Sequence, residues 1–265
     1  MKFGLQMSSL NQFIQTPQDI LKTFKKVKAI GYNYVQLQWL NGLSNSISAE
    51  SVRESLEKSG LICVGTQDIM FDYPEVKAYY PEVKDIYNNI DEIISRNILW
   101  QAKYVSGGMM PLPQQENEIS EMATQLNAVS KKMNDNGLIF DIHLTFTAYA
   151  TNGNSTPLEM LWEHLNDSVL LQPDFYHVVR GKANPIALIE KYSSRIAHAH
   201  FKDFKTFDNL TPVGQGVVPY KEIIEACIKH GVKYCWAEQE VWDKDPFECM
   251  KESFDFLVNM GLDAR

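Results

Sequence analysis

Residues 196–203 read Ile196-Ala-His-Ala-His-Phe-Lys-Asp203, an apolar stretch that contains two histidines two positions apart. Side chains alternate between the two faces of a β-strand, so His198 and His200 are predicted to share one face. If that face lines a crevice, two imidazoles lie together at a strand end, with Lys202 and Asp203 just beyond them. This combination is typical of metal binding or proton transfer. The alternative is a pair of core histidines whose hydrogen bonds are satisfied within the fold.

Strand-like stretches alternate with helical patterns along the whole chain. The predicted strands span residues 3–7, 33–39, 61–67, 102–106, 138–144, 169–174, 196–201 and 232–238. A cap residue followed by proline marks four predicted helix starts, at Thr16-Pro17, Thr156-Pro157, Asn184-Pro185 and Asp245-Pro246. A glycine suited to a left-handed helix end precedes four of the strands, at Gly31, Gly60, Gly137 and Gly231.

Eight such units in 265 residues predict an α/β fold, a (β/α)8 TIM barrel, formed by one domain over residues 1–265. A doubly wound open sheet would normally have a glycine-rich first turn, and no such motif or P-loop is present. Residues 213–216, Val-Gly-Gln-Gly, resemble a phosphate-binding loop only weakly, since two glycines before a helix more often form a turn.

Composition excludes several classes of partner. The chain has a net charge of −8, which disfavours nucleic acid as a partner because nucleic-acid affinity depends on Lys and Arg. We find no apolar run long enough to span a membrane and no signal peptide, so we expect a cytoplasmic protein. The four cysteines are widely scattered, which predicts free thiols. The sequence is compatible with a homo-oligomer but does not determine the oligomeric state.

Polar residues gather where the predicted strands end, which is where TIM barrels carry their active sites. They are Gln36 and Gln38, Gln67 and Asp68, Asp141 and His143, Asp174 and His177, His198 and His200, and Glu238 and Glu240. Burying so many carboxylates and imidazoles without a cation is costly, and mixed oxygen and nitrogen donors suit a divalent metal ion. The sequence therefore predicts one divalent cation (Mn, Mg, Co or Zn) at this end of the barrel.

These residues resemble the xylose-isomerase-like superfamily, specifically its sugar phosphate isomerase/epimerase group. The matching segments are residues 174–181 with Asn184-Pro185, residues 195–203, residues 213–216 and residues 236–240. The resemblance implies a TIM barrel with one metal ion held by an acid on the fifth strand together with Asp174, His200 and Glu238. It also implies a small sugar-like substrate and a proton exchanged beside its carbonyl group.

The fifth strand departs from the pattern of this group, because Asp141 stands where ketose epimerases have glutamate. Asp141 is expected as the fourth metal ligand and as a catalytic residue with Glu238, although His143 points to the same side and is the alternative ligand. Lys202 is expected to act as a base or to bind an oxyanion. The residues expected to contact substrate are His143, His177, Gln36 and Gln67.

The expected activity is that of a metal-dependent sugar isomerase or epimerase working through a cis-enediolate. The substrate would be a small sugar, a sugar phosphate or a related polyol ketone. A dehydratase of a keto-inositol or a sugar acid can start from the same enolate and is the first alternative. The second alternative is a barrel that binds a sugar without catalysis.

Overall fold

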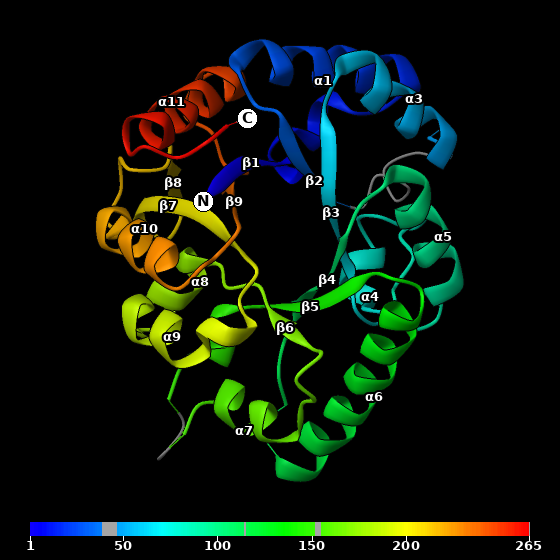
Figure 1. Cartoon of the computed structure of the whole chain (residues 1–265), viewed down its shortest axis with the longest axis vertical. Coiled ribbons are helices and arrows are strands. Elements are labelled where there is room, and N and C mark those ends of the chain that lie inside the picture. Colours follow the sequence, from blue (N-terminus) through cyan, green and yellow to red (C-terminus); the bar gives the residue numbers. More distant parts are fainter. Residues whose placement is uncertain (39–46, 114, 152–154, 265) are drawn as a thin grey trace.

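The computed structural model describes residues 1–38, 47–113, 115–151 and 155–264. Within them, parallel strands form a curled sheet that is surrounded by helices (Figure 1). The pairing order is β6-β5-β4-β3-β2-β1-β9-β7, and β8 pairs antiparallel with β7. The strands are Lys2–Gln6 (β1), Tyr34–Gln38 (β2), Ile62–Ile69 (β3), Tyr104–Met110 (β4), Ile139–Leu144 (β5), Leu170–Leu171 (β6), His198–Thr206 (β7), Asn209–Thr211 (β8) and Tyr234–Glu238 (β9).

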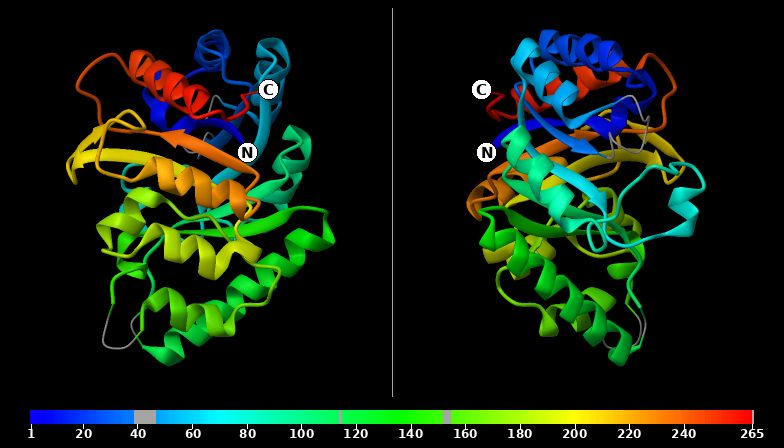
Figure 2. Two further views of the ribbon diagram at one scale, coloured as in Figure 1. Left: turned by 60° about the vertical axis from the view of Figure 1, so that its left-hand side comes forward. Right: turned by 90° about the vertical axis from the view of Figure 1, so that its right-hand side faces the viewer.

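Helices cover the outer face of this sheet on several sides, and the two chain ends lie near each other (Figure 2). The α-helices are Pro17–Ile30 (α1), Ala49–Ser59 (α3), Pro74–Lys77 (α4), Ile90–Trp100 (α5), Glu116–Asp135 (α6), Pro157–His164 (α7), Phe175–Arg180 (α8), Pro185–Tyr192 (α9), Tyr220–Lys229 (α10) and Pro246–Asn259 (α11). Short 3-10 helices occur at Met7–Phe13 (η1), Phe146–Ala148 (η2) and Ser193–Arg195 (η3). No described helix is both long and apolar enough to cross a membrane.

The helix boundaries predicted from caps are confirmed. Side chains of the four predicted N-cap residues accept hydrogen bonds from backbone N–H groups of the first helical turn, as expected for Thr16, Thr156, Asn184 and Asp245. At the other end, Gly60 follows α3 with φ of 70°, and its N–H donates to the Leu56 carbonyl at 2.9 Å. A residue with a Cβ atom would be strained in this left-handed conformation, which explains why glycine stands there.

Three strands differ from the prediction by more than two residues at one end. The fourth strand is expected at 102–106, but β4 continues to Met110. The sixth strand is expected at 169–174 but β6 contains only Leu170–Leu171, because Pro173 has no N–H to donate and Asp174 already caps α8. The seventh strand is expected to end at residue 201 but continues to Thr206, where it turns into β8. The barrel is joined between β6 and β7 by a bridge of Asp174 with His200 and by the His200 N–H, which donates to the Pro173 carbonyl at 2.8 Å.

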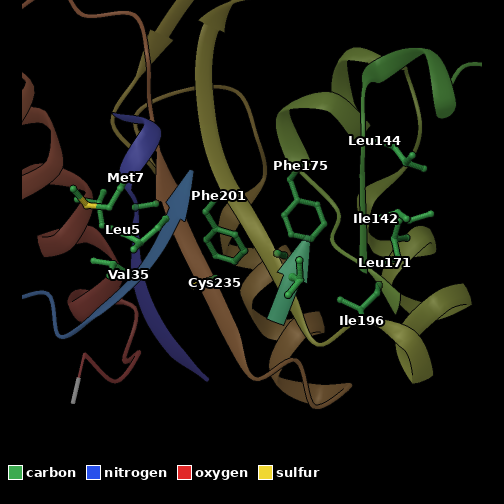
Figure 3. Packing of buried hydrophobic residues seen from close by; sticks show 14 of the residues in the cluster. Leu5, Met7, Val35, Ile142, Leu144, Leu171, Phe175, Ile196, Phe201 and Cys235 are labelled. Atoms are coloured by element: carbon green, nitrogen blue, oxygen red, sulfur yellow. The ribbon is translucent and has the colours of Figure 1, made fainter. Parts of the chain in front are cut away.

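On β5 and β7 the outer face is mainly apolar and the inner face is mainly polar. On β7, Phe201 packs outward against Phe175 of α8 with ring centroids 5.7 Å apart, and Ile142 of β5 faces outward in the same way (Figure 3). Because side chains alternate, the intervening residues of β7 and β5 point into the barrel. The outer layer holds the helices by apolar burial, while the inner layer is left for polar side chains.

Aromatic residues fill the barrel at the amino-terminal ends of its strands. Tyr34, Val64, Tyr104 and Trp236 form a separate buried cluster there, with the rings of Tyr234 and Trp236 stacked at 5.6 Å. This buried cluster fills the interior at the amino-terminal end of the barrel. Polar chemistry is therefore confined to the carboxyl-terminal ends of the strands, as the sequence predicts.

Asp203 organises the loop that contains the two glycines of residues 213–216. Its Oδ1 accepts from the N–H groups of Phe204 and Val218, at 2.9 and 3.2 Å, and its Oδ2 accepts from those of Gly214 and Gly216, at 3.0 and 2.9 Å. The side chain of Asp203 thus occupies the place that an anion would take in a phosphate-binding loop. The loop serves the fold, in agreement with the turn expected from its sequence.

We expect Asp203→Asn to destabilise the protein by about 1–3 kcal/mol, because an amide loses the charge and turns N–H groups toward backbone donors. The measurement is urea unfolding followed by circular dichroism. Asp208→Asn, at an exposed position of the neighbouring turn, is the control and should stay within about 0.5 kcal/mol of the parent. Equal midpoints for the two variants would contradict the role assigned to Asp203.

Candidate metal centre

Five side chains from neighbouring strand ends converge at the open end of the barrel. In one group, ligand atoms of Asp174, His200 and Glu238 all lie within 4.8 Å of one another, and in a second group those of His143, Asp174 and His177 do the same. Asp174 belongs to both groups and joins them. The predicted convergence of Asp174, His200 and Glu238 is therefore present in the structure.

Asp174 is fixed by the first turn of α8. Its Oδ1 accepts from the N–H groups of Tyr176 and His177, at 2.8 and 3.4 Å, whereas its buried Oδ2 has no hydrogen bond. Oδ2 instead lies 3.7 Å from His143 Nε2 and 3.9 Å from His177 Nε2. Burial by itself would raise the pKa of Asp174, but the neighbouring imidazoles and the Lys202 ammonium outweigh it and hold the pKa below its usual range.

The side chain of Gln36 orients the ring of His200. Its Nε2 lies 2.7 Å from Gln36 Oε1, an oxygen that can only accept, so the ring proton is on Nε2 and the lone pair is on Nδ1. Nδ1 lies 2.7 Å from Glu238 Oε2 without the alignment of a hydrogen bond. Burial, reinforced by the nearby His143, lowers the pKa of His200, so its ring stays neutral and able to bind a cation at neutral pH.

His143 is buried with both ring nitrogens unsatisfied. Neither Nδ1 nor Nε2 makes a hydrogen bond among the described residues, although the side chain is only 7% exposed. Its ring lies 4.7 Å from that of His200 and 5.8 Å from that of His177, between centroids. Burial likewise lowers the pKa of His177, to about 4.

These donors fit a divalent cation. Buried polar atoms without partners are rare in folded proteins, and here several of them face one another: Asp174 Oδ2, Glu238 Oε2, His200 Nδ1 and both nitrogens of His143. A mixed set of carboxylate oxygens and neutral imidazoles suits zinc, manganese or cobalt. The residues that would hold the ion are Asp174, His200 and Glu238, with His143 beside them.

Asp141 lies deeper in the barrel than this group. Its Oδ2 is 2.7 Å from His198 Nε2, and both side chains are fully buried. Because the indole N–H of Trp236 can only donate, and donates to His198 Nδ1 at 2.8 Å, the proton of His198 is on Nε2 and points at Asp141. Asp141 is expected as a metal ligand and a catalytic residue, yet it is in neither group of candidate ligands among the described residues, and this placement favours His143 for the fifth strand.

Gln36 and Gln67, expected to contact substrate, belong to a buried network of amides beneath the candidate ligands. Gln6 donates to Gln67 Oε1 at 2.8 Å and to Gln36 Oε1 at 3.2 Å, and Gln172 donates to Gln36 Oε1 at 3.1 Å. All four glutamines are at most 2% exposed. In this structure Gln36 orients His200, and neither Gln36 nor Gln67 reaches the surface of the barrel mouth.

Lys202 lies at the edge of the site and is paired with carboxylates. Its Nζ is 2.6 Å from Glu240 Oε2, and the ammonium also lies over the ring of Tyr176, 5.3 Å from the centroid. Burial alone would lower the pKa of Lys202, but Glu240, Glu238 and Asp174 together raise it above its usual value. Lys202 is therefore a cation at neutral pH, which favours a role in binding an oxyanion over a role as a base.

A cavity of about 340 Å³ opens beside Glu238. It is lined by Ser8, Ser9, Asn11, Gln12, Gln38, Tyr80, Glu240 and Trp242. Ser8 Oγ donates to Glu238 Oε1 at 3.1 Å, which connects the cavity to the candidate ligands. Its polar lining of hydroxyl and amide groups with one tryptophan is suited to a polyhydroxylated ligand.

Sequence reasoning missed part of this site and misplaced another part. Gln6, Gln172 and Ser8 carry no motif that singles them out, so only the folded geometry reveals them. Asp68 was expected at the strand ends beside Gln67, but it points outward and pairs with Arg96 of α5. Adjacent residues of a strand face opposite sides, which explains why Gln67 is inside and Asp68 outside.

The remaining evidence comes from similarity to known proteins. Residues 24–260 match the family described as xylose isomerase-like TIM barrel. The chain belongs to this family. The predicted superfamily and (β/α)8 fold are thereby confirmed, while no curated protein is detectably similar in sequence.

Solved structures from this family share the fold over nearly the whole chain. A sugar phosphate isomerase/epimerase from Parabacteroides distasonis ATCC 8503 has a TM-score of 0.80 and 20% identity, covering 97% of this chain and 98% of that one. An IolI protein with a bound zinc atom has a TM-score of 0.73 and 14% identity, covering 98% of each chain. The probable 3-DHS dehydratase AsbF from Bacillus anthracis has a TM-score of 0.72 and 15% identity, covering 98% of this chain and 99% of that one. At these identities the likeness concerns the fold.

For this member of the xylose isomerase-like family, we expect His200→Ala to lower zinc or manganese occupancy at least tenfold, since it removes a buried donor that faces Asp174 and Glu238. Elemental analysis after reconstitution and desalting measures this directly. His164→Ala on the surface of α7 is the matched control and should retain the metal. Full occupancy in His200→Ala would remove His200 from the ligand set.

A second pair of variants decides the fifth-strand ligand. His143→Ala should lose metal affinity while remaining folded, because neither ring nitrogen is engaged by a described residue and Nε2, 3.7 Å from Asp174 Oδ2, is available to bind the ion. Asp141→Asn should keep the metal, since an amide oxygen can still accept the proton of His198 and Asp141 lies below the group. Titration of each apo-protein with Zn²⁺ by calorimetry gives the two affinities. Metal loss in Asp141→Asn with none in His143→Ala would reverse the assignment.

Proposed function

We propose that this protein is a divalent-metal-dependent isomerase or epimerase of a small sugar, sugar phosphate or related polyol ketone, acting through a cis-enediolate. The observation that carries the proposal is the buried set of unsatisfied carboxylate and imidazole donors, which lies next to a polar cavity of about 340 Å³. Polar groups that converge in a concave site at the carboxyl-terminal ends of barrel strands are typical of an active site. The fold neighbour described as a sugar phosphate isomerase/epimerase supports the same class of reaction.

The bound ion would supply Lewis acidity, polarising a substrate carbonyl and stabilising the negative charge that develops when a neighbouring C–H is deprotonated. Asp174, His200 and Glu238, with His143 beside them, would hold it, and the fold neighbour with bound zinc supports such a centre in this barrel. Gln36 contributes by fixing which nitrogen of His200 is free. Asp141 contributes from below by accepting the proton of His198, so that the Nε2 of this buried ring has a partner.

Glu238 is the proposed proton carrier. Its Oε1 accepts from Ser8 at the wall of the cavity, so this carboxylate lies at the boundary between the candidate ligands and the space that a substrate would fill. A carboxylate in that position can take a proton from the carbon beside the carbonyl and return it to the same or the adjacent carbon. The Lys202 ammonium would then donate a hydrogen bond to the enediolate oxygen, in accordance with its raised pKa.

A dehydratase is the second candidate. An enolate that expels a hydroxyl group needs a proton for the leaving oxygen, which Glu238 can return after taking it from carbon. The Lys202 ammonium, kept charged by its raised pKa, can donate a hydrogen bond to that oxygen. The fold neighbour described as a probable dehydratase supports this chemistry in the same barrel. Both candidates share the initial proton abstraction and differ only in the fate of the enediolate.

The test is incubation of the Mn²⁺-loaded protein with a panel of ketoses, ketose phosphates and keto-inositols in D2O, followed by NMR. We expect deuterium at the carbon beside the carbonyl together with an isomer or epimer and no loss of water. Loss of water identifies the dehydratase, and binding without any exchange identifies a non-catalytic barrel.

In the same assay Glu238→Gln should lower the rate of exchange by at least a hundredfold, since an amide has a similar shape but cannot take up a proton. Substrate affinity should change much less. Glu225→Gln, at an exposed position of α10, is the control and should exchange at the parental rate. A near-parental rate in Glu238→Gln would assign the proton transfer to another residue.

A further inference from the structure

Arg180, the last residue of α8, is a cation without a carboxylate partner. Its Nη1 donates to the Tyr176 hydroxyl at 2.8 Å, and it forms no ion pair with any described residue. The residues outside the described ranges, 39–46, 114, 152–154 and 265, include no aspartate or glutamate. In a chain of net charge −8, an arginine at a barrel mouth would be expected to find an acid, so its isolation is notable.

Aromatic rings hold the guanidinium in place. Its central carbon lies 4.1 Å from the ring centroid of Phe146, 5.6 Å from that of Phe207 and 5.7 Å from that of Tyr176. The Tyr176 hydroxyl in turn donates to the Phe207 carbonyl at 3.1 Å, which fixes the ring that receives Arg180. Stacking covers the faces of the guanidinium and leaves its edge, where the remaining N–H donors point, for a ligand.

This aromatic frame borders the candidate metal centre. Phe146 follows β5 in η2, and its ring is stacked with that of His177 at 6.4 Å. Tyr176 receives the Lys202 ammonium on its ring, 5.3 Å from the centroid, and precedes His177 in α8. Phe207 lies in the turn after β7 and is 47% exposed, so the frame opens to solvent. A ligand that reaches the metal group can therefore extend toward Arg180.

We propose that Arg180 is a specificity residue that binds an anionic group, a carboxylate or a phosphate, at the far end of the substrate. The inference rests on the proposed function, in which the carbonyl end of that substrate lies at the metal group. A planar guanidinium with free N–H donors matches two oxygens of either anion, which a neutral hydroxyl cannot match. Lys202 does not compete for this role, because Glu240 already pairs with it.

The location of the other charges supports the same assignment. The described residues that line the cavity beside Glu238 include no Lys or Arg, and their one carboxylate, Glu240, is already paired with Lys202, so the cavity offers no free cation to an anion. Arg180 lies with Phe146 and His177, on the side of the mouth formed by β5 and α8. An anionic substrate would therefore lie with its charge toward α8 and its polyol part toward the cavity.

The experiment compares affinities for three sugars with a ketone at C2: D-fructose, D-fructose 6-phosphate, and D-fructuronate, whose carboxylate is at C6, the end far from the ketone. Calorimetry with the Mn²⁺-loaded protein gives each Kd, and the two anionic sugars distinguish phosphate from carboxylate. We expect at least one of them to bind ten or more times more tightly than fructose. Arg180→Gln should abolish that preference, because losing hydrogen bonds to a charged group costs at least about tenfold in affinity for the anionic sugar. The Kd for fructose, which lacks that group, should stay within about twofold of the parental value.

Matched variants separate recognition from folding. Arg180→Lys keeps the charge but not the planar donor pair and should retain part of the preference, whereas Arg53→Gln, on the exposed face of α3, should retain all of it. A parental protein that prefers fructose or binds all three equally, or an Arg180→Gln variant that weakens all three alike, would overturn the proposal. The D2O exchange assay tests the proposed function separately. If the preference depends on Arg180 but no exchange occurs, the anion site is supported and only the proposed activity is contradicted.

Discussion

The closure of the barrel and the candidate metal centre depend on the same contact. β6 and β7 share no extended ladder, and their join is the bridge of Asp174 with His200 together with the hydrogen bond from the His200 N–H to the Pro173 carbonyl. Pro173 ends the strand, and Asp174 starts α8 by capping it. The residues that close the sheet therefore also present a carboxylate and an imidazole to each other. Any change in this join alters strand pairing, the start of a helix and the ligand geometry together.

Beneath this contact, a buried layer of amides determines which histidine can bind a ligand. Gln36 Oε1 accepts from His200, Gln6 and Gln172, so the only proton that His200 carries is directed into the barrel. His198, two residues earlier, is saturated differently, by Trp236 on one nitrogen and Asp141 on the other. Unsatisfied polar groups are costly in a low-dielectric interior, and because the lower histidine is saturated, the unpaired imidazole nitrogens at this site belong to residues of the upper layer such as His200 and His143. Two chemically identical residues on one face of one strand thereby acquire different roles.

The sequence predicts the fold and part of the site, because strand alternation and the barrel rule depend only on local pattern. Caps, helix ends and the position of eight strands follow from residues such as Thr16 and Gly60, and Asp174, His200 and Glu238 meet because strand ends share one rim. Depth along the barrel does not follow, since strand stagger is set by tertiary pairing. For that reason the preference for Asp141 over His143, which share a face, could not take their depth into account, and the inward Gln36 could not be recognised as a support of His200. Arg180 lies within the matching segment 174–181, where sequence reasoning assigned it no role, and its lack of an acidic partner among the described residues exists only in the folded chain.

The two glutamates and Arg180 lie on different sides of the open end of the barrel, and this separation affects which C–H bond of a substrate would react. Glu238 and Glu240 lie on the side of β9 with the cavity, and Lys202 joins them to Tyr176, whereas α8 carries Arg180. A polyol ketone is nearly symmetric in its hydroxyl groups, so hydrogen bonds alone orient it weakly in such a site. A terminal anion would break that symmetry, because only one direction places it against Arg180 and away from the two glutamates. The direction in which the substrate lies would in turn select the carbon whose proton faces Glu238. On this argument the cation at the end of α8, which would touch no reacting atom, would determine the regiochemistry of the proposed reaction at the candidate metal centre.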